Sequence, residues 1–488
     1  MQMKRAFFMF MPLALWAVPQ LSFAAAALYL GSSGSAVVTL QNQLTVQGYL
    51  AAGNATGYYG AKTQAAVEQF QCDKKIACSA AVQGYGVYGP KTQAALAAVA
   101  QPAQPTSINT AQLTPKATGK FEVSAWVPYW NKATSTADAE AHLSQVTSIM
   151  PFAYTVNPDG TLMDTAQFLL TPWPAFIAQA KAAHVRVVPT VLWGDGSAEQ
   201  AILSNAASRV ALEDTIASLV KQKGFDGIDI DFEAKQADTI NYFSTFLKGL
   251  YARMGNKWVY CTVESRMPLE DRYPPGATVP PDANERANDF TALNQYCDRV
   301  EIMAYDQGTV DVRLDAARSA PYAPVADPGW VSDLVTLAAQ SISRNKLIIG
   351  IPTYGYEYTV TPQGDGSFKY QTLWALTQKY ALEVAAQLGI NAYRTSADEA
   401  GFTYDPAQLS AAAPQNGDTT QTQQQSPTTT VTQNLGSQLS GNQPFNYITW
   451  SDAQAVKDKL DLAKSLGVRG VALFSLGGED PAVWNILP

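Results

Sequence analysis

From residue 121 onward, short apolar runs alternate with helical patterns, and this alternation constrains the fold more than any other feature of the chain. Helical periodicity fills several of the gaps between the runs, as at residues 173–183 and 197–223. The runs with the length and composition of buried strands are residues 121–127, 148–154, 185–193, 225–232, 257–264, 300–305, 346–352 and 468–475. Eight strands that alternate with helices predict an α/β fold, a (β/α)8 TIM barrel over residues 121–488.

The seventh and eighth strands lie too far apart for one crossover helix, because about 115 residues separate them. This spacing predicts a small α+β insertion over about residues 356–450. Within it, residues 411–444 are dominated by Gln, Thr and Ser. Such a tract cannot bury enough apolar surface to order itself, so we expect a flexible loop there.

The candidate chemistry lies in the fourth strand, which reads FDGIDIDFE over residues 225–233. Alternate residues of a strand face the same side, so Asp229, Asp231 and Glu233 share one face and the apolar residues between them share the other. Three crowded carboxylates inside a barrel lose hydration and repel one another, which raises the pKa of at least one and creates a proton donor. The run ends at the carboxyl end of its strand, where barrel enzymes carry their active sites.

Two alternatives for this acidic run are a solvated edge strand and a calcium site. The flanking isoleucines disfavour an edge strand, and calcium loops usually contain Gly and Asn. The chain has only two histidines and no CxxC pair. We therefore expect no metal and no cofactor.

The run 225–233 resembles the signature of family 18 glycoside hydrolases, and the resemblance covers about residues 122–488. It implies a retaining mechanism in which the 2-acetamido oxygen of the substrate, not a carboxylate, attacks the anomeric carbon to form an oxazolinium ion. By this resemblance Glu233 protonates the leaving oxygen and later activates water. Asp231 orients the acetamido group, and Asp229 shares charge or a proton with it. Asp226 is expected to be structural.

Other stretches are similar to further strands of the same family. Residues 301–306 resemble its sixth strand, where Tyr305 would donate a hydrogen bond to the acetamido oxygen and Asp306 would hold the sugar. Period-two alternation places Met303 on the same face as Tyr305. Residues 128–130, 152–154 and 350–356 resemble its first, second and seventh strands. Tyr129 and Phe152 are candidates to line the sugar pocket, with ordinary core packing as the alternative.

The closing segment, residues 470–481, also resembles the family, but Phe474 stands where the family usually has Trp. That Trp stacks under the sugar at the reaction centre. Phe offers a smaller aromatic face, so this departure leaves the identity of the substrate and the turnover open.

The N-terminal region carries an internal repeat, because residues 57–67 return in similar form as residues 86–96. In each copy a Gly-rich turn precedes a short helix, and an earlier helix places Val37, Leu40 and Leu44 on one face. Residues 28–99 therefore predict a small helical domain, which resembles the peptidoglycan-binding domain of bacterial wall hydrolases. A helical bundle that only spaces or dimerises is the alternative. Residues 100–120 are rich in Pro, Thr, Ala and Gln and predict a linker.

The first residues have the pattern of a signal peptide over residues 1–24: Lys4 and Arg5, an apolar stretch from 6 to 18, and a small-x-small site at 22–24. An uncleaved anchor is the alternative. We expect a secreted protein, extracellular or periplasmic, that is associated with the cell wall, is monomeric and has no membrane contact after cleavage.

The four cysteines are Cys72, Cys78, Cys261 and Cys297, an even number that suggests disulfides in an exported protein. Three pairings are arithmetically open, and the local one, Cys72 with Cys78 and Cys261 with Cys297, is favoured. Four free buried thiols are the alternative.

Net charge and motifs together reduce the number of possible functions. The formal net charge is −8, with no long basic run, which argues against nucleic acid as a partner. The sequence predicts a secreted glycoside hydrolase that cuts β-1,4 bonds at N-acetylglucosamine, with peptidoglycan as the polysaccharide partner. The alternatives are a chitinase, a catalytically inactive carbohydrate-binding barrel and a wall-binding scaffold.

Overall fold

The computed structural model describes residues 27–47, 49–50, 56–100, 120–408, 429–432, 434–435 and 443–488. The chain divides into two compact units, Met1–Gln112 and Leu113–Pro488. The predicted signal peptide and nearly all of the predicted linker lie outside the described residues.

The N-terminal unit is a small bundle of α1 (Ser35–Val46), α2 (Ala61–Asp73) and α3 (Pro90–Ala100). Two buried glutamines explain its internal repeat. The side-chain amide of Gln41 donates to Thr63 Oγ1 (2.8 Å) and accepts from a glycine N–H in the intervening turn (2.9 Å). Gln71 makes the same pair of contacts in the second copy, with Thr92 (2.9 Å) and a turn glycine (2.8 Å). Each copy is thus a turn and a helix joined to the preceding helix by one glutamine.

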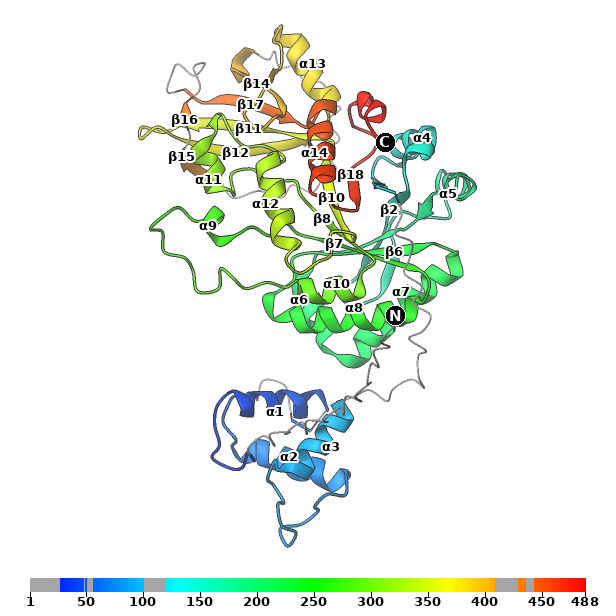
Figure 1. The fold of residues 1–488 in the computed structure, drawn as a ribbon, viewed down its shortest axis with the longest axis vertical. Coiled ribbons are helices and arrows are strands. Elements are labelled where there is room, and N and C mark those ends of the chain that lie inside the picture. Colours follow the sequence, from blue (N-terminus) through cyan, green and yellow to red (C-terminus); the bar gives the residue numbers. More distant parts are fainter. Residues whose placement is uncertain are drawn as a thin grey trace, which may run out of the picture. The chain divides into compact units, whose positions relative to one another are not determined.

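The C-terminal unit contains a closed parallel barrel with helices between its strands, as the sequence predicts (Figure 1). The barrel strands in chain order are β1 (Glu122–Val127), β2 (Ser148–Val156), β4 (Arg186–Val187) with β5 (Thr190–Trp193), β6 (Gly227–Phe232), β7 (Trp258–Val263), β8 (Arg299–Ile302), β10 (Leu347–Pro352) and β18 (Gly470–Phe474). Pairing of β1 with both β2 and β18 closes the barrel. The helices of this unit are α4 (Lys132–Ala141), α5 (Trp173–Ala182), α6 (Gly196–Ser204), α7 (Ala206–Lys223), α8 (Ile240–Met254), α9 (Leu269–Arg272), α10 (Phe290–Tyr296), α11 (Val312–Ala317), α12 (Pro328–Ala338), α13 (Gln378–Leu388) and α14 (Ala453–Ser465).

Two predicted elements are interrupted. The third predicted strand divides into β4 and β5, with Pro189, which lacks an N–H for the ladder, between them. The predicted helix 197–223 is two helices, α6 and α7, because Asn205 has an extended backbone (φ −85°, ψ 118°). Its side chain accepts from the N–H groups of Ala207 (2.9 Å) and Ser208 (3.1 Å), which caps α7.

The insertion begins directly after β10, at the carboxyl end of the barrel strands, and contains α13 and a six-stranded sheet (Figure 1). Its strands are β11 (Gly355–Pro362), β12 (Ser367–Leu376), β13 (Tyr393–Arg394), β14 (Ala400–Tyr404), β15 (Thr429–Thr432) and β17 (Phe445–Trp450). All pairings are antiparallel. The insertion thus starts at the same end of the barrel as Glu233.

Two short strands lie within the tract 411–444 for which the sequence predicts a flexible loop. β15 pairs with β12 and β16 (Asn434–Leu435) pairs with β9 (Ser319–Ala320). The β-branched composition of Thr429–Thr432 suits an edge strand, and the free edge of β12 supplies the hydrogen-bonding partner that composition alone does not show. The remainder of the tract lies largely outside the described residues.

Two disulfides are present, and each joins cysteines that are neighbours in sequence order. Cys72–Cys78 closes the end of α2, and Cys261–Cys297 links β7 to the residue after α10. No helix within the described parts of the chain has the length and hydropathy of a membrane span.

The opposite, amino end of the barrel is closed by charged side chains. Arg299 donates from Nε to Glu122 Oε2 (2.8 Å), and Arg186 lies 3.0 Å from the same oxygen. The Glu122 pKa is lowered: burial raises it, but hydrogen bonds and charge from the two arginines outweigh that effect. A buried pair of this kind is costly to break on one side only, so it holds the first strand against the sixth.

We predict that Asn205→Ala lowers the free energy of unfolding by about 1 kcal/mol, because it removes the acceptor that caps α7. Asn205→Ser should retain most of the stability, since Ser caps well. Chemical denaturation of the full chain measures both. Equal stability of the alanine variant and wild type would show that the cap does not matter.

Candidate active site

The three acids of β6 and its end form a column in the barrel interior. Asp229 and Asp231 are buried, and Asp229 pairs in register with Thr190 on β5 and Tyr260 on β7. Glu233 follows the last residue of β6, and its N–H donates to the carbonyl of Trp193 (2.7 Å). The period-two alternation therefore brings together the three side chains selected from the sequence.

Asp229 lies deepest and is held by neutral donors. Its carboxylate accepts from Thr190 Oγ1 (2.8 Å), Thr262 Oγ1 (2.9 Å) and Trp126 Nε1 (3.4 Å). Burial raises the pKa of Asp229 to about 6, although these hydrogen bonds oppose the shift. None of these three donors was selected from the sequence. Thr190 and Thr262 occupy inward positions of predicted strands, so the alternation that selected the acids could have selected them too.

The next two acids favour their protonated forms more strongly. Burial, followed by the charges of Glu233 and Asp229, raises the pKa of Asp231 well above its usual range. Asp231 Oδ1 is buried with no hydrogen-bond partner among the described residues. Burial also raises the pKa of Glu233, followed by the negative charge of Glu264. One proton shared along this column costs less than three adjacent buried charges.

Glu233 has a charged neighbourhood that the sequence analysis missed. Lys235 Nζ is fully buried, contacts the carbonyl of Phe232 and lies 3.5 Å from Glu264 Oε1. Glu264 Oε2 accepts from Asn288 Nδ2 (2.7 Å). The position of Glu264 at the carboxyl end of a predicted strand was a signal for it. Lys235 had none, because nothing local shows that a lysine folds inward.

A close backbone contact fixes the chain just beyond Glu233. Ala234 has a left-handed backbone (φ 56°). A Cβ at Gly196, the first residue of α6, would lie 2.0 Å from the carbonyl oxygen of Ala234. Only glycine fits at this approach, so α6 sets the position of the residue that follows Glu233.

Tyr305 and Asp306 lie just beyond β8. Tyr305 is buried, and burial followed by the charge of Asp231 raises its pKa well above the usual value, so it remains a hydrogen-bond donor. Asp306 has φ 59°, and its Oδ1 accepts from the hydroxyls of Tyr354 and Tyr356, the latter at 2.7 Å. Both tyrosines were noticed in the sequence only as part of a strand. They join the sugar-side candidate Asp306 to the start of the insertion.

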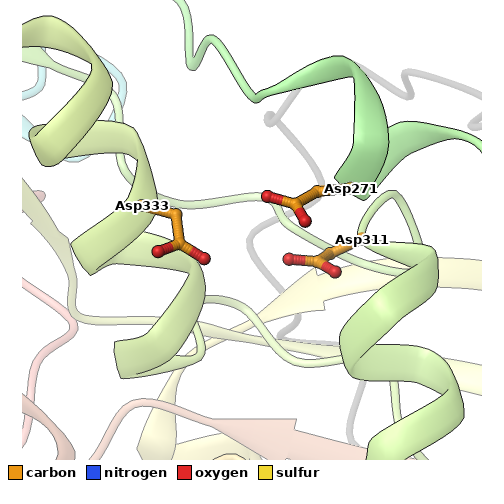
Figure 2. A group of neighbouring side chains, drawn as sticks. All are labelled: Asp271, Asp311 and Asp333. Atoms are coloured by element: carbon orange, nitrogen blue, oxygen red, sulfur yellow. The ribbon is translucent and has the colours of Figure 1, made fainter.

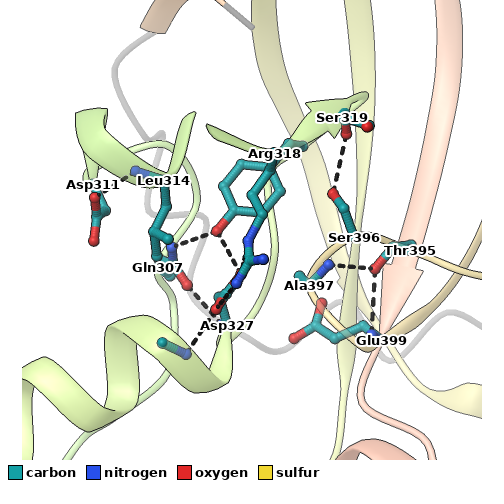
Figure 3. Close-up of polar contacts among 12 residues, drawn as sticks. Gln307, Asp311, Leu314, Arg318, Ser319, Asp327, Thr395, Ser396, Ala397 and Glu399 are labelled. Atoms are coloured by element: carbon teal, nitrogen blue, oxygen red, sulfur yellow. Dashed lines mark hydrogen bonds and ion pairs between the residues drawn. The ribbon is translucent and has the colours of Figure 1, made fainter. Parts of the chain in front are cut away.

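A polar network behind Asp306 ties its loop to the insertion (Figure 3). Gln307 Oε1 accepts from the N–H of Asp327 (2.7 Å), whose carboxylate pairs with Arg318 through two contacts of 2.9 Å. Glu399, in the insertion, accepts from the two backbone N–H groups that precede Asp327 (3.0 and 2.7 Å). The N–H of Gln307 donates to the carbonyl of Val325 (3.0 Å), so the residue after Asp306 is joined to the segment that Glu399 binds.

Aromatic side chains pack together around Phe474 and Tyr305, next to the acids. Phe474 stacks on Tyr305 with centroids 5.0 Å apart and an interplanar angle of 16°. It also meets Trp126 (5.6 Å) and Phe152 (5.9 Å) edge-on. Phe152 is therefore largely a core residue, with 8% of its surface exposed. Phe474, which stands where the resemblance predicts Trp, thus contacts Trp126, Phe152, Tyr305 and Tyr354.

Two further candidates lie at the edge of this cluster. Met303 is half-buried and packs against the group that contains Tyr305 and Tyr354. Tyr129 is 37% exposed and contacts Trp130 edge-on at 5.3 Å. Tyr129 is thus accessible to a ligand, whereas Met303 lines the wall.

Among the described residues, one group of three acids has the spacing of metal ligands, and it lies outside this column. Figure 2 shows Asp271, Asp311 and Asp333 converging from three segments. Arg313 already lies among them, 3.0 Å from Asp271, 2.5 Å from Asp333 and 3.5 Å from Asp311. Its guanidinium supplies the positive charge that three carboxylates require, so the cluster fits an ion-pair network.

Comparison with known proteins agrees with this geometry. The family model "Glycosyl hydrolases family 18" matches residues 125–479, and "Putative peptidoglycan binding domain" matches residues 33–96.

Curated relatives are distant. "Uncharacterized glycosylase YvbX" of Bacillus subtilis is 21% identical over 60% of this chain and 69% of its own length. "Cortical fragment-lytic enzyme" of Bacillus cereus is 21% identical over 70% of this chain and 67% of its own. Human "Di-N-acetylchitobiase" is 29% identical over 36% of this chain and 43% of its own. The shared length ranges from under half to about two thirds of these proteins.

Solved structures share the fold. The spore cortex-lytic enzyme SleL of Bacillus megaterium superposes with a TM-score of 0.55 at 20% identity, over 76% of this chain and 74% of that one. A class V enzyme of Pseudomonas fluorescens, described as a chitininase, superposes with a TM-score of 0.57 at 19% identity, over 75% and 98%. With its family model matched over most of the barrel, the chain belongs to family 18 of the glycoside hydrolases.

Proposed function

We propose that this glycoside hydrolase cleaves β-1,4 bonds at N-acetylglucosamine with retention, using the acetamido group of the substrate as the nucleophile. The observation that carries the proposal is the column of Asp229, Asp231 and Glu233, buried in the barrel and topped by Tyr305. Glu233 is the general acid. Its raised pKa keeps it protonated to higher pH than an exposed carboxyl, and after proton transfer it activates water as a base.

The two inner acids support the positive charge that develops on the acetamido group. Asp231 has an unpartnered buried oxygen, which is free to accept from the acetamido N–H. Asp229 balances the charge from below, where its three donors hold it in place. Tyr305 donates to the acetamido oxygen. Asp306 and Met303 contact the sugar from the wall, while Phe474 and Tyr129 supply apolar faces to it, with Phe152 packed against Phe474.

Peptidoglycan is the proposed polymer. The N-terminal unit matches a peptidoglycan-binding family, and two aligned relatives are named for cortex lysis. Tyr29, Leu30 and Tyr58 are 58%, 54% and 55% exposed on that unit. They lie close together, because Ser33 bridges to Tyr58. This apolar patch suits contact with sugar rings. The proposal includes secretion, attachment at the cell wall and a monomeric state.

Chitin is the second candidate, favoured by the aligned relatives named as chitobiase and endochitinase. Both polymers offer N-acetylglucosamine to the same column of acids. They differ in charge, because chitin is neutral and peptidoglycan carries carboxylates.

We predict that wild type releases muropeptides with reducing-end N-acetylglucosamine from purified sacculi and that Glu233→Gln is slower by about 100-fold or more, because the amide cannot transfer a proton. Mass spectrometry of the products from sacculi and from chitin measures both. Release from chitin alone would contradict the choice of polymer. Equal rates for the variant and wild type would contradict the mechanism.

The pH dependence of kcat/KM tests whether the charge of Glu264 raises the pKa of Glu233. Glu264 raises the pKa of Glu233, so Glu264→Gln should lower that pKa, the more so because Lys235 then lacks its partner. Glu233 must be protonated to act as the acid, so kcat/KM falls as pH rises through its pKa. We therefore expect the alkaline limb of the pH profile to move to lower pH. The exposed Glu270→Gln is the control and should leave the limb unchanged; a limb that stays in place in Glu264→Gln would refute the coupling.

A further inference from the structure

The loop between β7 and α10 encloses two adjoining hollows on the flank of the barrel, with volumes of about 360 and 610 Å³. Both are lined by Arg266, Asn284, Arg286, Leu337 and Gln340. We call the smaller one, which Asn288 also lines, the arginine pocket. Its lining combines donors with apolar surface.

The arginines of this loop lack counterions. Within the described residues, Arg266, Arg272 and Arg286 form no ion pair. Arg266 lies 5.0 Å from the centre of the Phe290 ring, and Arg286 donates only to the carbonyls of Ala283 (2.6 Å) and Glu285 (2.7 Å). Burial, then repulsion from the other two arginines, lowers the pKa of Arg286.

The neighbouring acids are already engaged. Asp289 lines the arginine pocket but accepts from the N–H of Thr291 (2.8 Å). Asp271 and Asp333 line the larger hollow and pair with Arg313. Arg266 and Arg286 thus line a cavity that also contains the Asp289 carboxylate, and neither arginine forms an ion pair in the described part of the chain.

A chain of contacts links this pocket to Glu264 and Lys235, whose charges act on the pKa of Glu233. Asn288 donates to Glu264 (2.7 Å), which lies 3.5 Å from the Nζ of Lys235. The Oδ1 of Asn288 is buried and has no hydrogen-bond partner in the described part of the chain. The pocket therefore offers an acceptor from Asn288 beside the cationic donors, next to the charged groups that surround the catalytic acid.

We propose that the arginine pocket binds a carboxylate substituent of the glycan chain through Arg266 and Arg286. Guanidinium groups bind carboxylates through two parallel hydrogen bonds, which gives geometry as well as attraction. The inference rests on the proposed function, because peptidoglycan bears carboxylates and chitin does not. The carboxylate comes either from the stem peptide or from the lactyl group of the muramyl sugar.

The test compares full-length wild type with the double variant Arg266→Gln/Arg286→Gln. Lys221→Gln/Lys223→Gln, which removes two exposed positive charges from α7, is the control. Each protein acts on glycan strands with stem peptides, on the same strands after an amidase has removed the peptides, and on a neutral chito-oligosaccharide. Amidase treatment hydrolyses the amide between the lactyl group and the peptide, so it removes the peptide carboxylates and frees a lactyl carboxylate.

We expect the double variant to raise KM for peptide-bearing strands about tenfold, with kcat little changed, because it loses the charge-assisted hydrogen bonds to the carboxylate. Cleavage of the neutral oligosaccharide should stay within about twofold, which also shows that the variant folds. If the arginine dependence vanishes on stripped strands, the stem peptide is the ligand; if it appears only there, the freed lactyl carboxylate is; dependence on both shows that the pocket accepts either carboxylate. Equal KM for wild type and variant on all three substrates would overturn the proposal.

A direct binding measurement separates this inference from the proposed function. Titration calorimetry with the free stem tetrapeptide and with N-acetylmuramic acid should show binding to wild type and to the lysine control, and loss of binding in the double variant. Arginine-dependent binding without cleavage of wall strands would refute the proposed function and retain the pocket. If wall strands are cleaved but neither binding nor KM depends on the arginines, the pocket is refuted and the proposed function stands. Arg286→Lys keeps the positive charge but cannot form the two parallel hydrogen bonds of a guanidinium group, so it should bind with intermediate affinity.

Discussion

The burial of Asp229 is the constraint on which the rest of the barrel interior depends. A carboxylate taken out of water is costly unless donors replace the lost hydration, and here β1, β5 and β7 each supply one, from Trp126, Thr190 and Thr262. The arrangement needs a closed barrel, since no open sheet brings three such strands around one side chain. Burial, followed by the charges of Glu233 and Asp229, raises the pKa of Asp231, two residues later, so its protonated form is favoured.

The other parts of the unit hold this column in place from outside. The ion pair of Glu122 with Arg299 closes the amino end of the barrel. At the carboxyl end, Glu399 of the insertion binds the N–H groups of Val325 and Ala326, and the carbonyl of Val325 accepts from the N–H of Gln307, next to Asp306. Both arrangements bury charge together with its hydrogen-bonding partners, which is the condition under which buried charge is tolerated. The insertion thus helps to position Asp306, a residue that we expect to contact the sugar.

Regular patterns in the sequence predicted the large features of the fold. The eight strands, the insertion after β10 and the inward face of Asp229, Asp231 and Glu233 all follow from spacing and period-two alternation. Side chains whose role comes from long-range contacts were missed. Lys235 turns inward because Glu264, about 30 residues away, meets it, and the arginine pocket needs Arg266 and Arg286 from separate ends of one loop. The break at Asn205 and the strand β15 depend on a cap and on a free sheet edge, and periodicity reports neither.

The central claim is that the acetamido group of the substrate attacks the anomeric carbon, so that cleavage proceeds with two inversions. The most direct measurement is proton NMR of the first product released from a β-linked N-acetylglucosamine oligomer, recorded before mutarotation. The account predicts that the new reducing end appears first as the β anomer and that a thiazoline analogue of the oxazolinium ion inhibits the enzyme. Initial release of the α anomer would contradict it, because water would then have displaced the leaving group in one step.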